Sequence, residues 1–136
     1  MMRGALALAV LMAGGCATTP PGPDTTRWMY EPHALTSQQS AAVQSAVSSQ
    51  LKDPESARYT DFRARKVIMP GGKVAYQVCG YVNSKNSFGG YVGKTPFAGA
   101  FPWSQPERFV ITGVGQDWQR TGVMEGCAQL GLPLPA

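Results

Sequence analysis

The stretch at 79–97 combines several glycines with aromatic rings and two lysines. Glycines allow a ligand to approach the backbone closely, and aromatic rings beside amides and lysines form surfaces that bind a sugar, a peptide or an anion. The alternative is a wide hairpin loop whose rings fold back and cap the core. The candidate binding residues of this loop are Asn83, Lys85, Asn86, Phe88, Tyr91 and Lys94.

Catalytic chemistry has few candidate residues. A hydrolase needs a nucleophile with a base beside it, and the sole histidine, His33, lies in a proline-rich segment. Asp53 and Glu55 suit the start of a short helix, and Asp61 is expected to point outward from a strand. One histidine and two separated cysteines do not make a structural zinc site. We therefore expect a protein without enzymatic activity, cofactor or metal, with a small envelope hydrolase as the alternative.

The N-terminal segment 1–15 has the layout of a signal peptide. Arg3 is followed by an apolar block at 5–13 and by small residues. The block is shorter than a membrane span requires. Small residues directly before Cys16 resemble the lipobox of bacterial lipoproteins, although Ala13 stands where Leu is usual. We expect Cys16 to be the acylated first residue of the mature chain, with ordinary cleavage next to this cysteine as the alternative.

The cysteine count favours the same interpretation. An odd number of cysteines in an exported protein leaves one without a disulfide partner, and lipidation of Cys16 supplies the reason. Cys79 and Cys127 are then expected to form a disulfide, because exported proteins fold in an oxidising compartment. Ala17 follows the lipidated cysteine, as in lipoproteins sorted to the outer membrane. The expected location is the cell envelope, facing the periplasm, on the outer membrane if the host is Gram-negative.

The segment 16–35 is expected to be a tether, because prolines and threonines favour extended, solvated chain. Within it, Trp28, Met29 and Tyr30 are expected to pack onto the edge of the folded domain, or alternatively to dock a partner. The net charge is only +4 over 136 residues, without a cluster of Lys and Arg in the sequence. A nucleic acid partner is therefore not expected.

A helix is predicted over 37–51. Thr36 and Gln39 fit a capping box at its start, and Asp53-Pro54-Glu55 predicts a short helical turn over 54–58. The apolar positions at helical spacing are Val43, Val47 and Leu51.

The period then changes to two, which predicts antiparallel strands. A hairpin is predicted from 62–68 and 74–82 around a turn at 69–72, with Lys66 on the apolar face of its first strand, either at a bulge or with its stem along the end of the sheet. Further strands are predicted within 91–98 and 109–114. The predicted last helix lies within 117–130.

These elements predict one domain at 36–136 of the α+β class. It has a small antiparallel sheet of three to four strands, with an N-terminal and a C-terminal helix packed on one face of the sheet and one disulfide joining the last helix to the second strand.

Two motifs carry a resemblance to known proteins. Asp53-Pro54-Glu55-Ser56-Ala57 is followed by the run from Val78 to Tyr91, which reads VCGYVNSKNSFGGY. Both motifs, in this order, resemble an uncharacterised family of small exported bacterial proteins and lipoproteins, over roughly residues 51–97. The resemblance implies no activity, and it marks the loop as a signature of architecture or of binding.

Taken together, the sequence predicts a lipid-anchored binding or accessory module of the cell envelope. Its expected contacts are the membrane, through the lipid, and an envelope protein or a cell-wall glycan. A structural subunit of an envelope protein complex is the second interpretation.

Overall fold

The computed structural model describes Gly15, residues 18–20, Gly22, Asp24 and residues 26–136. The expected signal peptide other than Gly15, and the expected lipidation site at Cys16, lie outside this part of the chain. Among the described residues, no helix is long and apolar enough to cross a membrane.

Five strands form one antiparallel sheet in the order of the sequence, and two helices and a 3-10 turn accompany it. The sheet therefore has one more strand than the predicted upper limit of four, while the α+β class is confirmed. The elements are β1 (Met29–His33), α1 (Ser37–Ser48), η1 (Pro54–Ser56), β2 (Arg58–Ile68), β3 (Val74–Asn83), β4 (Thr95–Phe101), β5 (Val110–Val114) and α2 (Gln119–Gln129).

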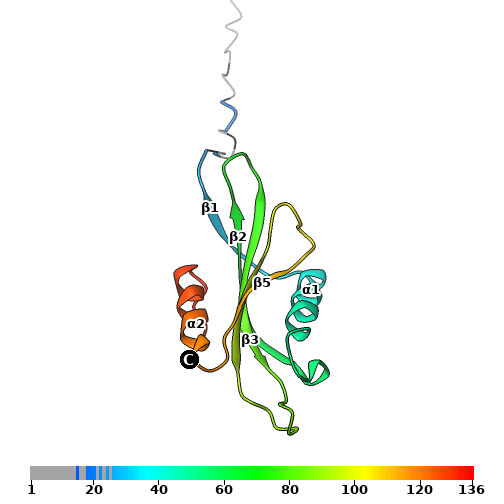
Figure 1. The fold of residues 1–136 in the computed structure, drawn as a ribbon. Helices are drawn as coiled ribbons and strands as arrows, with labels where there is room; N and C mark the ends of the chain where they lie inside the picture. Colours follow the sequence, from blue (N-terminus) through cyan, green and yellow to red (C-terminus); the bar gives the residue numbers. More distant parts are fainter. Residues whose placement is uncertain (1–14, 16–17, 21, 23, 25) are drawn as a thin grey trace, which may run out of the picture.

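The two helices cover opposite faces of the sheet (Figure 1). Val78 and Val82 of β3 pack with Val43 and Val47 of α1, together with Phe97, Phe101 and Phe109. Cys79 and Tyr81 point to the other face, where they pack with Cys127, Leu132 and Leu134. The expectation that both helices lie on one face was wrong. The sequence signal was the apolar run at 78–82, since a strand that is buried on both faces loses the polar alternation.

Helix α1 begins as predicted and ends three residues earlier. The Thr36 side chain accepts from the Gln39 backbone N–H, and the Gln39 side chain accepts in return from the Thr36 N–H, so both halves of the capping box are present. The predicted turn after Asp53 is the 3-10 helix η1, and the Asp53 carboxylate accepts from the Ser56 N–H.

Helix α2 has weak local signals and is held by tertiary contacts. No side chain caps its N-terminus, and Gly122 and Gly126 lie inside it. The predicted disulfide between Cys79 and Cys127 is present, with the two Cα atoms 6.2 Å apart, and it joins α2 to β3. Burial of Cys127 and the contacts after the helix complete the attachment.

The first strand lies within the segment expected to be a tether. β1 pairs along β2 from Met29 to His33, so the folded part of the chain begins before residue 36. Lys66 pairs opposite Glu31, with 3.6 Å between the ammonium nitrogen and the carboxylate oxygen. The register irregularity of β2 lies instead between Thr60 and Arg63.

The two remaining strands differ from prediction in their bounds. β4 begins at Thr95 and runs to Phe101, because the residues before it close a separate small hairpin. β5 lies within the predicted range, and its one partner among the described strands is β4, with a bulge opposite Ala98 and Gly99.

Candidate functional site

The glycine-rich loop between β3 and β4 is a short, well-bonded hairpin. Lys85 and Tyr91 form an isolated β-bridge, and the Asn86 backbone N–H donates to the Gly90 carbonyl. The Asn86 side chain accepts from the amides of Phe88 and Gly90, and Gly89 takes the positive φ of 81° that the turn requires. Asn86 is therefore a structural residue of the turn.

The three rings of the loop have three different environments. Phe97 is fully buried in the core, whereas Phe88 at the tip of the hairpin is 97% exposed. Tyr91 is 37% exposed, and the Arg58 guanidinium lies 4.4 Å from the centre of its ring. The loop thus does not cap the core with all of its rings, and Phe88 contributes a large apolar surface to solvent.

The two motifs that carry the family resemblance touch each other. The Lys85 N–H donates to the Ser56 hydroxyl oxygen over 2.8 Å, and the Tyr91 hydroxyl donates to the Ser56 carbonyl over 3.2 Å. Ser56 in turn donates its hydroxyl to the Asp53 carbonyl. The first motif is therefore the base on which the hairpin of the second motif rests.

Beside this hairpin, the chain forms a cationic cleft of about 500 Å³ between three segments that are far apart in sequence. Four positive side chains and one negative side chain line it, and hydroxyls and amides fill the spaces between them. The charged lining residues are Lys52, Lys85, Lys94, Arg120 and Asp117.

Tyr81 places two of these cations. The Lys94 ammonium and the Arg120 guanidinium lie 5.5 and 5.6 Å from the centre of its buried ring. Arg120 also donates to the Lys94 carbonyl, which ties the first turn of α2 to the end of the hairpin. Two like charges are thus held close to one aromatic ring.

Asp61 partly neutralises the cleft from one side. Its carboxylate lies 3.0 Å from the Lys94 ammonium, at a backbone φ of 57° in the bulge of β2. The hydrogen bond from Lys94, with a further one from Thr60, lowers the pKa of Asp61 below its ordinary 3.8. Since the pKa of Asp61 is lowered, its carboxylate is ionised at neutral pH. The ion pair with Lys94 is lost only in acid, when the pH falls below 3.8 and the carboxylate takes up a proton.

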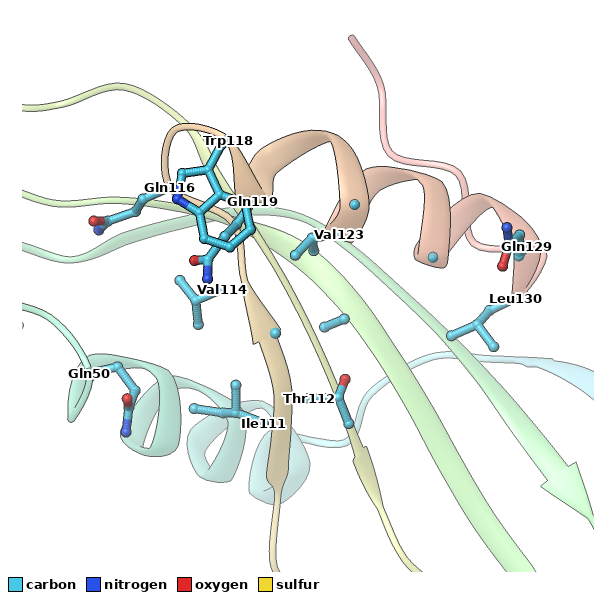
Figure 2. A pocket seen from close by; sticks show the side chains of 14 residues that line it. Gln50, Ile111, Thr112, Val114, Gln116, Trp118, Gln119, Val123, Gln129 and Leu130 are labelled. Carbon is cyan, nitrogen blue, oxygen red and sulfur yellow. The ribbon is translucent and has the colours of Figure 1, made fainter.

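A second cavity, the neutral groove, continues from the cleft along β5. It has a volume of about 930 Å³ and shares Gln50 and Gln116 with the cationic cleft. Figure 2 shows that α2 and β5 both contribute side chains to it, with Trp118 and Gln119 at the start of α2. Its lining consists of amides, a threonine, glycines and apolar side chains, without a charged residue, and Trp118 is 85% exposed.

The structure brings some of the predicted binding residues together and separates others. Lys85, Asn86 and Lys94 line the cationic cleft. Asn83 supports the loop by accepting from the Gly93 N–H, while Phe88 and Tyr91 are absent from the lining of the cleft. Sequence reasoning missed Lys52, Arg120 and Trp118, because only the fold unites them with the loop.

The described residues contain no group of three His, Cys, Asp or Glu side chains placed to hold a metal ion. Asp53 and Asp61, two of the carboxylates considered for catalysis, have the structural partners given above. The charged lining of the cleft and the uncharged lining of the groove would suit a ligand with a charged end and a neutral, extended body.

Comparison of the chain with protein-family models, with curated proteins and with solved structures finds no match in any of the three.

Proposed function

We propose that this protein is a non-enzymatic binding module of the cell envelope, and that it holds the anionic part of its ligand in the cationic cleft. The single observation that carries the proposal is the convergence of Lys52, Lys85, Lys94 and Arg120 on one cavity. Like charges repel, so their gathering costs free energy unless an anion offsets it.

The net charge of the cleft favours an anion even when the nearby carboxylates are included. Asp61 and Asp117 leave an excess of two positive charges among the six groups. The hydroxyls of Ser84 and Thr95, also in the lining, add hydrogen-bond partners for carboxylate oxygens.

The location in the envelope is part of the same proposal. The disulfide accounts for Cys79 and Cys127, which supports lipidation of Cys16 as the use of the third cysteine. The segment between Cys16 and β1 then separates the membrane from the cleft. The alternative, a structural subunit of an envelope protein complex, would use the same surface, because the neutral groove continues from the cleft. In that case the ligand is another protein of the complex.

Fluorescence anisotropy with a labelled oligo-aspartate peptide tests the cleft. We expect the full chain to bind it in a salt-dependent manner, and Lys52→Ala and Lys94→Ala to weaken binding by roughly fivefold each at low salt. Asp61→Asn keeps a side chain suited to positive φ and releases Lys94, so we expect it to tighten binding by about twofold to fivefold.

Lys73→Ala is the matched control, because it removes the same charge at the far end of the β2–β3 hairpin, where Lys73 lies over the ring of Trp103. If Lys73→Ala weakens binding as much as Lys94→Ala does, the attraction is due to net charge alone and the proposal of a cleft site is wrong.

A further inference from the structure

The outer edge of β5 is an open template for strand pairing. Within the part of the chain that the structure describes, β5 pairs only with β4, and its sequence Val-Ile-Thr-Gly-Val holds neither a charge nor a proline. Soluble proteins usually protect such edges with charged residues, prolines or covering elements. The strand has one bulge, so its regular pairing surface is the end near Val114.

The hydrogen-bonding pattern shows which groups are free to pair there. Gly115 donates its N–H to the Pro96 carbonyl over 2.7 Å, so position 115 bonds inward to the chain at the start of β4. Inward and outward positions alternate along an antiparallel strand, and the N–H and C=O of Val114 therefore point outward.

The neutral groove beside β5 has room for the side chains of an added strand. Residues 119, 122, 123 and 126 of α2 line it, and their spacing of i, i+3, i+4 and i+7 places them on one face of the helix. A Cβ built on Gly122 or Gly126 meets no atom within 4 Å. The groove is therefore wide because these two positions lack side chains.

The groove and the cationic cleft form one continuous surface through Gln50 and Gln116. A chain that follows β5 toward its C-terminal end thus reaches Lys94 and Arg120. Charge complementarity requires acidic groups at that end, while the body of the occupant lies against amides and apolar side chains.

We infer that an extended polypeptide segment with acidic residues at one end adds to the sheet as a sixth strand on β5. Its backbone pairs with Val114 and its neighbours, its side chains on one face enter the neutral groove, and its carboxylates lie in the cationic cleft. The inference rests on the proposed function for its acidic end.

A second copy of this chain fits the surface less well. Antiparallel pairing of two β5 strands brings Val, Ile, Thr and Gly side chains to the groove, and none of these is large enough to fill a cavity of about 930 Å³. The occupant is therefore a segment of a different protein.

Selection of short random peptides displayed on phage against the full chain tests the inference. We expect enriched peptides to alternate β-branched or aromatic residues and to end in Asp or Glu. Gly122→Leu fills the groove and should weaken a selected peptide roughly tenfold or more, whereas Gly122→Ala adds one carbon and should leave its affinity within about twofold.

The backbone pairing has its own test. Methylation of alternate peptide nitrogens removes donors without changing side chains, and it should weaken binding roughly tenfold or more, as should Val114→Pro. Each variant is melted in parallel. Gly122→Leu should melt no lower than the wild type, because leucine is a better helix former than glycine, so lost binding is then due to the filled groove.

The remaining outcomes would each overturn one part of the inference or of the proposed function. Equal binding to Gly122→Leu, or to the methylated peptide, overturns strand addition. Retention of purified peptidoglycan in place of peptides, blocked by Gly122→Leu, assigns the groove to a glycan and leaves the proposal for the cationic cleft intact. A dimer that Val114→Pro dissociates assigns the edge to a second copy. If Lys94→Ala binds the selected peptide normally while Gly122→Leu does not, strand addition stands and the proposed function fails.

Discussion

Within the part of the chain that the structure describes, the sheet has two outer edges, β1 and β5, and of these two strands β1 alone carries a proline and a charged residue. At β1, Pro32 removes a backbone donor and Glu31 pairs with Lys66 across to β2. At β5, a run of small and β-branched residues faces a groove. Both edges are strands of the same antiparallel sheet, so the difference lies in their residue types.

Further contacts reinforce the protection of β1. The Arg65 guanidinium lies 4.2 Å from the centre of the Tyr30 ring. His33 lies with its ring 4.4 Å from that of Tyr76, and its Nε2 is 2.7 Å from the Gln39 side-chain oxygen. The strand nearest the tether is thus fixed by polar and aromatic contacts, whereas the other edge is left free for pairing.

Removal of the disulfide is expected to have the largest effect on stability, because this bond ties α2, which forms one wall of the groove beside β5, to the central strand β3. The double variant Cys79→Ala and Cys127→Ala should lose about 4 kcal/mol of unfolding free energy, since the bond closes a loop with a sequence separation of 48. Urea denaturation measures this free energy. Cys16→Ser is the control and should leave the unfolding free energy unchanged. A double variant as stable as the wild type would contradict a stabilising role of the disulfide.

Gly99→Ala should come next, because it breaks the β4–β5 pairing at its bulge. An added Cβ would lie 2.6 Å from the Val110 carbonyl oxygen and would also overlap the ring of Phe109. We expect a loss of about 3 kcal/mol, which thermal melting would show as a lower Tm. Gly72→Ala serves as a comparison, because φ is positive there but the surroundings are open. A Gly99→Ala protein as stable as the wild type would mean that β5 is free to shift.

Gly122→Ala should act in the opposite direction. An alanine side chain has room at this position, and alanine favours a helix over glycine by about 1 kcal/mol, so the variant should unfold at a higher urea concentration. A destabilised Gly122→Ala protein would show that α2 packs more closely over β5 than the open space around Gly122 indicates.

Removal of the protection at β1 should change stability least. The combined change Glu31→Val and Pro32→Val removes a half-exposed ion pair of a few tenths of a kcal/mol and restores a backbone donor. We expect nearly unchanged melting together with new self-association in sedimentation velocity. A variant that stays monomeric would show that further contacts, and not these two residues, protect the edge.

Local sequence signals predicted much of the fold. The capping box at Thr36 and Gln39, the turn after Asp53 and the hairpin around 69–72 each depend on neighbouring residues, and all three are present. The pairing of Cys79 with Cys127 followed from counting cysteines in an expected oxidising compartment.

The sequence could not show what depends on the sheet as a whole. The placement of α2 opposite α1 is set by which β3 side chains each helix covers. Lys52, Lys94 and Arg120 are separated along the chain, and only the meeting of three connections makes them one cationic cleft. β1 was missed because its five residues include a proline and a charge, which is the composition of a protected edge.

The disulfide also fixes one wall of the groove to the sheet. Helix α2 forms one wall of the groove, yet it has two internal glycines and no side-chain cap, and Cys127 ties it to β3. In a reduced chain, only noncovalent contacts, such as those of Tyr81 with Leu132 and Leu134, hold this wall to the sheet. If the proposed strand addition is right, we therefore expect the reduced chain to capture a strand more weakly than the oxidised chain, so that formation of the bond would be a maturation step for binding.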